Sequence, residues 1–192
     1  MSGEKFTYFA LLDEKGAPGV AKKILSTTNA ASELGYVAKR RLYAPNNKLG
    51  FLLGVARAKG DVFLFRYPGW ISSILFFILL LKRIQGVKVV IDIPTPLVIA
   101  LKEVDYAEKT KGRKLVSKFS FLFTGSWVLW PAHRVIQYAD EGKWFSFGVR
   151  NKTIKMGNGI NIDPSMPLIN PACRASGLNL IGVAQLAGWH GY

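Results

Sequence analysis

The sequence is poor in the residues that hold metals and disulfides. It has one cysteine, Cys173, and two histidines, His133 and His190, far apart in the chain. A single cysteine excludes an internal disulfide framework. This spacing also matches no pattern of metal ligands. We therefore expect a protein that uses neither a metal nor another cofactor.

Acidic residues are also scarce. The chain has 12 Asp and Glu against 26 Lys and Arg, which gives a formal net charge of +14. Such a balance favours anionic partners: nucleic acid, anionic lipid or phosphorylated substrates. The basic residues are spread along the chain without a recognised nucleic-acid motif, so we expect no nucleic-acid partner.

Long apolar runs are missing as well. The most apolar stretch, Trp70 to Leu81, is shorter than the roughly 20 residues of a membrane span, and we expect it to form a buried helix. The first residues, MSGEKFTYFALL, lack the charged-then-apolar pattern of a signal peptide. These features predict a cytoplasmic protein.

What the sequence does contain is a steady alternation of strand and helix patterns. Its 192 residues, 49% of them hydrophobic, can bury a substantial core. The alternation predicts an α/β fold, a Rossmann-like parallel sheet with helices on both faces. Strands are expected at 5–12, 37–44, 61–67, 87–91, 133–138 and 152–156, and helices at 20–34, 49–59, 71–85 and 139–147.

The stretch VKVVIDIPTP, Val87 to Pro96, provides the first candidate site residues. A nearly continuous β-branched run that ends at proline predicts a strand buried on both faces. Ligands bind beyond the carboxyl ends of such strands. Asp92 and Thr95 are delivered there, and Arg66 follows the preceding strand as a candidate for a phosphate or carboxylate. The alternatives are that Asp92 only caps the next helix and that Arg66 is merely exposed.

A turn, DEKGAPG, joins the first strand to the first helix. Backbone amides at a helix start can hold an anion, so Gly16 and Gly19 are candidates for backbone contacts with a ligand. The turn matches neither the GxGxxG fingerprint nor a P-loop. A plain tight turn explains it equally well.

A basic run, Lys109 to Lys118, merges into an aromatic-rich apolar helix expected at 119–130. Lysines that meet head groups, followed by aromatics that enter their boundary, are typical of an interfacial membrane helix. The alternative is a core helix with a solvated basic start. The candidate membrane contacts are Lys111, Arg113, Lys114, Lys118, Phe119 and Trp127.

The composition changes after a sharp turn at Asn158 and Gly159. Three prolines follow in quick succession, and a fresh strand pattern begins at Leu178. We expect a first domain at 1–163, a linker at 164–177 and the start of a second domain at 178–192. Asn158 and Gly159 would then form the interdomain turn.

Several of these segments resemble the amino-terminal half of bacterial retaining glycosyltransferases of the two-domain GT-B class (glycosyltransferase family four), of the kind that builds capsular or surface polysaccharide. The residues that carry the resemblance are FRYPG (65–69), IDIPTP (91–96), HRVIQYAD (133–140), KMGNGINID (155–163) and GVAQLAGWHGY (182–192).

The resemblance implies transfer of a sugar from a nucleotide-sugar to a lipid-linked or polysaccharide acceptor, with anomeric retention. It also implies that the first domain binds the acceptor. Because of their common placement at strand ends, we expect Arg66, Thr95 and the two glycines to contact the acceptor, with Asp92 as the catalytic candidate. The resemblance also implies peripheral attachment at the inner face of the cell membrane.

The chain departs from the family in two respects. Pro94 stands roughly where many members have a histidine, and the family's donor-phosphate residues would lie beyond Tyr192. We therefore expect a truncated gene product or isolated domain that is inactive alone. The alternative is a non-enzymatic basic α/β module that binds anionic membrane or a partner transferase.

Overall fold

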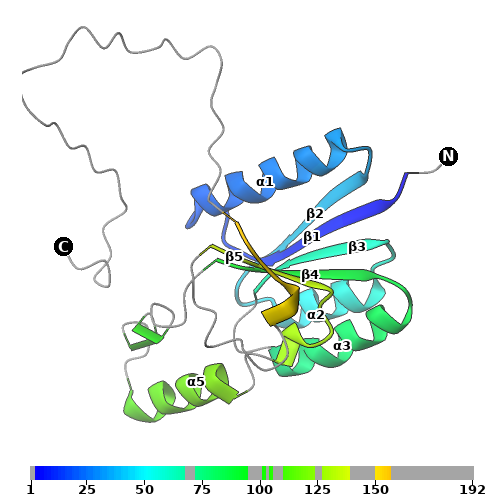
Figure 1. The fold of residues 1–192 in the computed structure, drawn as a ribbon. Coiled ribbons are helices and arrows are strands. Elements are labelled where there is room, and N and C mark those ends of the chain that lie inside the picture. The colour runs from blue at the N-terminus through cyan, green and yellow to red at the C-terminus, as the bar shows by residue number, and fades with distance from the viewer. Residues whose placement is uncertain are drawn as a thin grey trace, which may run out of the picture.

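The computed structural model describes residues 3–67, 72–94, 101–102, 104–105, 110–123, 127–138 and 150–156 (Figure 1). The expected linker and second domain lie outside these residues. So do the expected helix at 139–147 and three candidate site residues: Thr95, Asn158 and Gly159.

The described residues form an α/β fold around an all-parallel, six-stranded sheet of order β2-β1-β3-β4-β5-β6. The predicted fold class is therefore confirmed. The strands are β1 (Lys5–Leu11), β2 (Val37–Tyr43), β3 (Val62–Arg66), β4 (Lys88–Ile93), β5 (Arg134–Gln137) and β6 (Thr153–Lys155). Because β1 lies between β2 and β3, the strand order reverses here, which creates a switch point at the carboxyl ends of β1 and β3.

Helices cover both faces of the sheet. In Figure 1, α1 (Pro18–Glu33) lies on one face, while α2 (Lys48–Arg57) and α3 (Ser72–Ile84) lie on the other. Gly35 and Gly86, with φ of +90° and +87°, follow α1 and α3. A left-handed residue after a helix is favourable only for glycine, so these two positions end the helices sharply.

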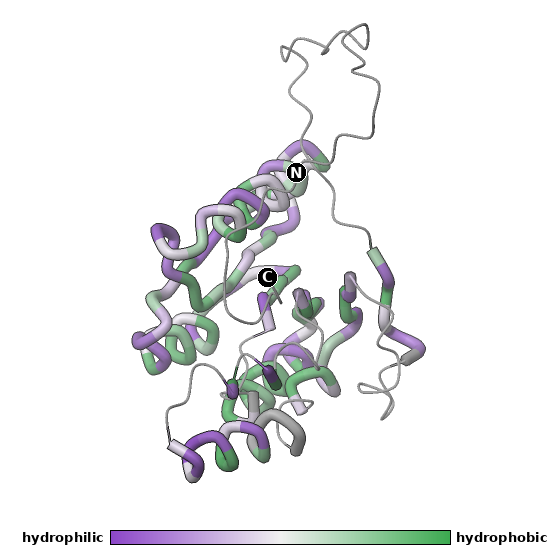
Figure 2. The backbone as a smooth tube through the Cα atoms, turned by 90° about the vertical axis from the view of Figure 1, so that its left-hand side faces the viewer, coloured by the Kyte–Doolittle hydropathy of each residue, from purple (hydrophilic) through white to green (hydrophobic). Residues whose placement is uncertain are grey.

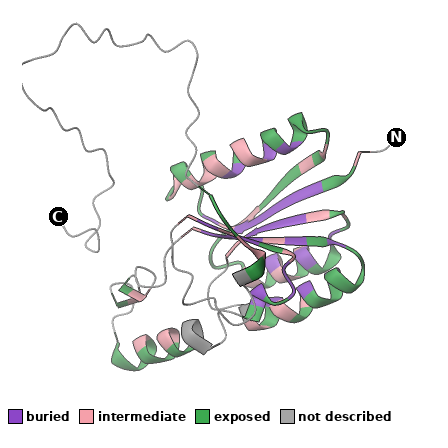
Figure 3. Cartoon of the chain, viewed as in Figure 1, coloured by how far each residue is buried: buried purple, intermediate pink, exposed green. Residues whose placement is uncertain are grey.

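Side-chain alternation along the strands builds two separate cores. Figure 3 shows that buried residues are concentrated on the central strands of the sheet. Tyr8 and Ala10 pack with Ile24 of α1. Phe9, between them in sequence, belongs to the core under α2 and α3. There its ring stacks on Phe65, with centroids 5.0 Å apart. The central strands are thus buried on both faces, as the apolar run of β4 predicts.

The second strand of the chain has a charged centre and lies at the edge of the sheet. β2 is the terminal strand of the sheet, and its central residues Lys39, Arg40 and Arg41 are exposed. An edge strand tolerates charge because one of its sides meets water instead of another strand.

Two helix predictions need correction. α5 spans Lys111–Phe123, so the basic run is itself helical, and Trp127 lies in a short 3-10 helix, η2 (Trp127–Leu129), not in a helix over 119–130. Lys and Arg are good helix formers, which suits the basic run to a helix. The expected buried helix, α3, is buried on one side only, because the sheet lies on just one of its sides.

The core under α2 and α3 yields the first prediction. Phe9 is fully buried, and Phe9→Ala should lower the free energy of unfolding by about 3–5 kcal/mol through lost burial and an unfilled cavity. Urea unfolding followed by circular dichroism measures the change. Leu25→Ala, at an exposed position of α1, is the control and should change it by less than about 1 kcal/mol. Equal losses would contradict this assignment of the core.

Candidate functional site

Asp92 is a buried carboxylate near the carboxyl end of β4. Its residue is 2% exposed, and its neighbours in the ladder are Arg66 of β3 and Ile136 of β5. A carboxylate taken out of water costs several kcal/mol unless charges and hydrogen bonds compensate it. The partners of Asp92 therefore define the chemistry of this edge.

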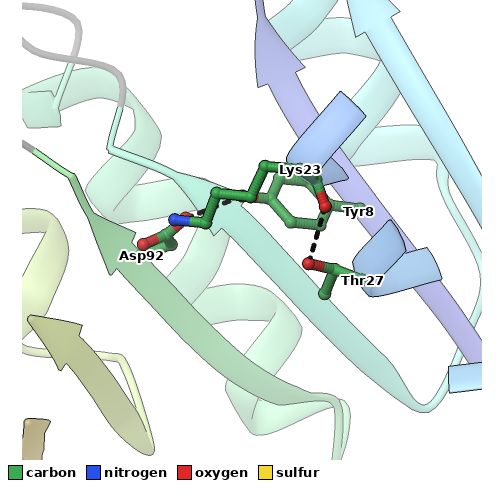
Figure 4. A network of polar contacts seen from close by, with 4 residues as sticks. All are labelled: Tyr8, Lys23, Thr27 and Asp92. Atoms are coloured by element: carbon green, nitrogen blue, oxygen red, sulfur yellow. Dashed lines mark hydrogen bonds and ion pairs between the residues drawn. The ribbon is translucent and has the colours of Figure 1, made fainter. Parts of the chain in front are cut away.

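Two side chains from the N-terminal part of the chain donate hydrogen bonds to one oxygen of Asp92 (Figure 4). The Tyr8 hydroxyl donates to Oδ2 at 2.8 Å, and Lys23 Nζ donates to the same atom at 3.2 Å. Thr27 Oγ1 donates to the Lys23 carbonyl at 2.9 Å, one turn along α1. β1, α1 and β4 are thus joined at a single carboxylate.

The other oxygen of Asp92 has a different environment. Oδ1 is buried and has no hydrogen-bond partner of good geometry among the described residues. The ring of Tyr138, just after β5, lies beneath Lys23 Nζ, which is 3.8 Å from the ring centroid. Because the remaining acceptor capacity of Asp92 is not used by well-placed protein donors, a ligand hydroxyl or amide can use it.

These contacts shift the protonation of the surrounding groups. Burial, then the Asp92 charge and hydrogen bonding, raises the pKa of Tyr8, and the same causes raise the pKa of Tyr138. Burial lowers the pKa of Lys23 and outweighs the opposing effect of Asp92, while Arg66 lowers it further. Both tyrosine hydroxyls therefore stay protonated and remain hydrogen-bond donors.

Arg66 ends β3 directly beside Asp92 in the ladder. It is half-buried, and its charge acts on Tyr8, Lys23 and Tyr138. Within the described part of the chain, its guanidinium forms no hydrogen bond or ion pair. We call these five residues, Tyr8, Lys23, Arg66, Asp92 and Tyr138, the Asp92 cluster. With two cations and one carboxylate, the cluster can take up an anionic ligand.

The start of the helix that Asp92 would cap in the alternative interpretation follows Pro94 and lies outside the described residues. In the described part of the chain, the Asp92 carboxylate accepts from Tyr8 and Lys23, and not from a helix amide. Asp92 also lies within β4, which continues to Ile93. The expected meeting of Asp92 and Arg66 at one sheet edge is confirmed by the ladder.

Gly16 and Gly19 occupy the turn before α1 and the first turn of that helix. The turn is held by Asp13, whose Oδ1 accepts from the Lys15 amide at 3.1 Å and whose carbonyl accepts from the Ala17 amide at 2.9 Å. Among the described residues, neither glycine joins the hydrogen bonds of the Asp92 cluster. This geometry favours the plain tight turn, because a carboxylate already lies against Gly16.

Sequence reasoning missed Tyr8, Lys23 and Tyr138. A weak signal existed for the tyrosines, because a buried tyrosine generally needs a partner for its hydroxyl. Lys23 gave no comparable signal, since lysine on a surface helix is ordinarily solvated. Its direction toward Asp92 depends on how α1 packs on the sheet.

The candidate membrane contacts lie mostly at the surface. Lys111, Arg113 and Phe119 are exposed on α5, and Lys114 is half-exposed. Lys118 Nζ forms an ion pair with Asp105 at 2.7 Å. Trp127, the remaining candidate, is 43% exposed and its ring contacts Phe76 of α3. None of the described helices is long and apolar enough to cross a bilayer.

The sheet order, the helical layers and a polar cluster at the carboxyl edge define the class: a parallel α/β fold of Rossmann-like topology. Comparison of the chain with models of protein families, with curated proteins and with solved structures finds no match.

The raised pKa of Tyr8 yields the second prediction. The folded protein retains the Tyr8 proton above pH 10.0, the ordinary pKa of the group, whereas the unfolded chain releases it. The stability contributed by Tyr8 is thus fully present below pH 10.0 and is lost as the pH rises above it. Urea unfolding at a series of pH values should show a shallower alkaline loss for Tyr8→Phe than for the parent.

Comparison with Tyr8→Phe is needed because Lys23, whose pKa is lowered, contributes the opposite trend with pH. In a second variant, Asp92→Asn, absorbance titration should show the most alkaline tyrosine ionisations at lower pH than in the parent. Parallel pH profiles for the parent and Tyr8→Phe would contradict the burial of an un-ionised Tyr8 against Asp92.

Proposed function

We propose that this chain is the acceptor-binding, membrane-associating part of a glycosyltransferase, which moves a sugar from a nucleotide-sugar to a lipid-linked or polysaccharide acceptor. The proposal combines the motif resemblance described above with the chemistry of the Asp92 cluster. No donor-sugar site is apparent among the described residues, so the proposal concerns the acceptor side.

The observation that carries the proposal is the buried Oδ1 of Asp92, which accepts no hydrogen bond of good geometry among the described residues, although the Tyr138 hydroxyl lies near the carboxylate. Leaving a buried acceptor unpaired costs about 1–3 kcal/mol. A sugar hydroxyl is a suitable donor for this oxygen. A ligand that supplies one would recover this cost, and Asp92 would then orient the hydroxyl that accepts the transferred sugar.

Arg66 supplies the second half of the recognition. A guanidinium binds phosphate oxygens through two parallel hydrogen bonds, and Arg66 is adjacent to Asp92 across the ladder. An acceptor that carries both a hydroxyl and a phosphate, such as a lipid-linked sugar phosphate, satisfies both groups at once. Neither a neutral sugar nor a free phosphate would do so.

The alternative function is a non-enzymatic module that binds anionic membrane or a partner transferase. The observation that favours it is α5, whose segment KGRKLVSKFSFLF contains four basic residues and no acidic one. Membrane binding is common to both functions. Only the glycosyltransferase proposal requires a polar ligand at the Asp92 cluster.

The third prediction tests the acceptor site with a short-chain prenyl diphosphate sugar as the probe. Calorimetric titration should detect binding to the full chain. Arg66→Ala and Asp92→Asn should each weaken it by about tenfold or more, because each removes a charge-assisted contact worth roughly 1.5–3 kcal/mol. Arg57→Ala, at an exposed arginine of α2, is the matched control and should bind like the parent.

Two outcomes would count against the proposal. If both site variants bind the probe like the parent, the Asp92 cluster is not the acceptor site. If the parent binds anionic vesicles but not the prenyl diphosphate sugar, the non-enzymatic module replaces the transferase hypothesis. Circular dichroism of each variant separates lost binding from lost folding.

A further inference from the structure

α3 has apolar side chains on both of its sides. Leu75 and Leu79 are fully buried against the sheet. The opposite side carries four large apolar residues spaced three and four apart, which are between 55% and 75% exposed (Figure 3). We call them the α3 stripe: Ile74, Phe77, Leu81 and Ile84. A surface helix normally turns polar side chains to water, so a contiguous exposed stripe indicates a binding surface.

Exposed aromatic side chains of the segment around η2 lie beside α3. The ring of Trp127 contacts Phe76, with centroids 6.2 Å apart. Arg83 Nη1 donates to the Pro131 carbonyl at 3.2 Å, which ties the segment after η2 to the end of α3. Trp127 and Trp130 are 43% and 57% exposed. Tryptophan prefers the boundary between water and hydrocarbon, because its ring is apolar and its N–H is polar.

The helices on this side of the sheet are free of acidic residues. α2, α3 and α5 contain two, two and four Lys or Arg respectively, and no Asp or Glu. Figure 2 shows hydrophobic and hydrophilic residues interleaved along the helices below the sheet. The partner that fits an apolar stripe bordered by helices with an excess of positive charge is itself apolar and negatively charged.

We propose that the α3 stripe docks on an anionic lipid bilayer. The helix would lie in the membrane plane, with Phe77 and Leu81 in the acyl boundary and the exposed basic residues of α2 and α5 at the head groups. The inference rests on the membrane part of the proposed function. It moves the main contact from α5, which the sequence indicated, to α3.

A second copy of this chain fits the α3 stripe less well. Pairing of two such faces would oppose the basic residues of one copy with those of the other, and like charges across an interface are unfavourable. A bilayer rich in anionic lipid supplies the apolar phase and the countercharge together.

The fourth prediction concerns vesicle binding by the full chain. In flotation assays, the parent should bind vesicles of equal parts phosphatidylglycerol and phosphatidylcholine, and bind pure phosphatidylcholine vesicles more weakly. Phe77→Ser/Leu81→Ser should weaken binding by at least about tenfold, because two large apolar side chains no longer leave water. The matched control is Leu25→Ser/Leu34→Ser, at two exposed leucines on the side of α1.

The controls keep this inference separate from the acceptor site. The vesicles contain no sugar, and Arg66→Ala should bind them like the parent even if it loses the prenyl diphosphate sugar. Circular dichroism and thermal unfolding verify that the serine variants fold.

Four results would overturn the inference. The parent fails to bind anionic vesicles, or the stripe and control variants bind equally well. In the third, Lys111→Glu/Lys114→Glu abolishes binding while the stripe variant retains it, which would assign the contact to α5 alone. Sedimentation of the parent and the stripe variant tests the second-copy alternative. A dimer that is lost in the variant without a change in vesicle binding would assign the α3 stripe to self-association.

Discussion

The burial of Asp92 is the interaction on which the carboxyl edge of this sheet depends. A carboxylate that is 2% exposed is tolerated only because Tyr8 and Lys23 both donate to Oδ2. Those donors come from β1 and α1, so the charge of β4 is compensated by the first βα unit of the chain. The same contacts leave Oδ1 without a well-placed donor. One oxygen of Asp92 is therefore satisfied within the chain, and the other is the oxygen that the proposed acceptor would use.

The two faces of the sheet have different roles in the proposed function. On the side of α1, the polar Asp92 cluster interrupts the apolar core beside the switch point. On the other side, α2 and α3 close the core, and the outer surface of α3 stays apolar. Because the strands point side chains alternately to the two faces, one thin sheet separates a polar site from a surface suited to lipid.

Much of the fold was predictable because its signals are local. The β-branched run of β4, the basic centre of the edge strand β2 and the glycines after α1 and α3 each act through nearest neighbours. The contacts that could not be predicted from the sequence also share a cause, because they depend on how separate elements pack. Lys82 lies near the end of α3, and its Nζ is buried and donates to the Ala58 carbonyl at 2.8 Å, between α3 and α2. Such a contact depends on how two helices pack.

The sequence by itself determined the alternation of strands and helices, the edge to which Arg66 and Asp92 are delivered, and the excess of positive charge. Only the tertiary structure decided that Tyr8 and Lys23 are the partners of Asp92 and that one side of α3 faces solvent. Local propensity and periodicity depend on residues a few positions apart, whereas Tyr8 and Asp92 are 84 positions apart. Their contact exists because the parallel sheet places β1 and β4 on either side of β3, and α1 packs on this face of the sheet.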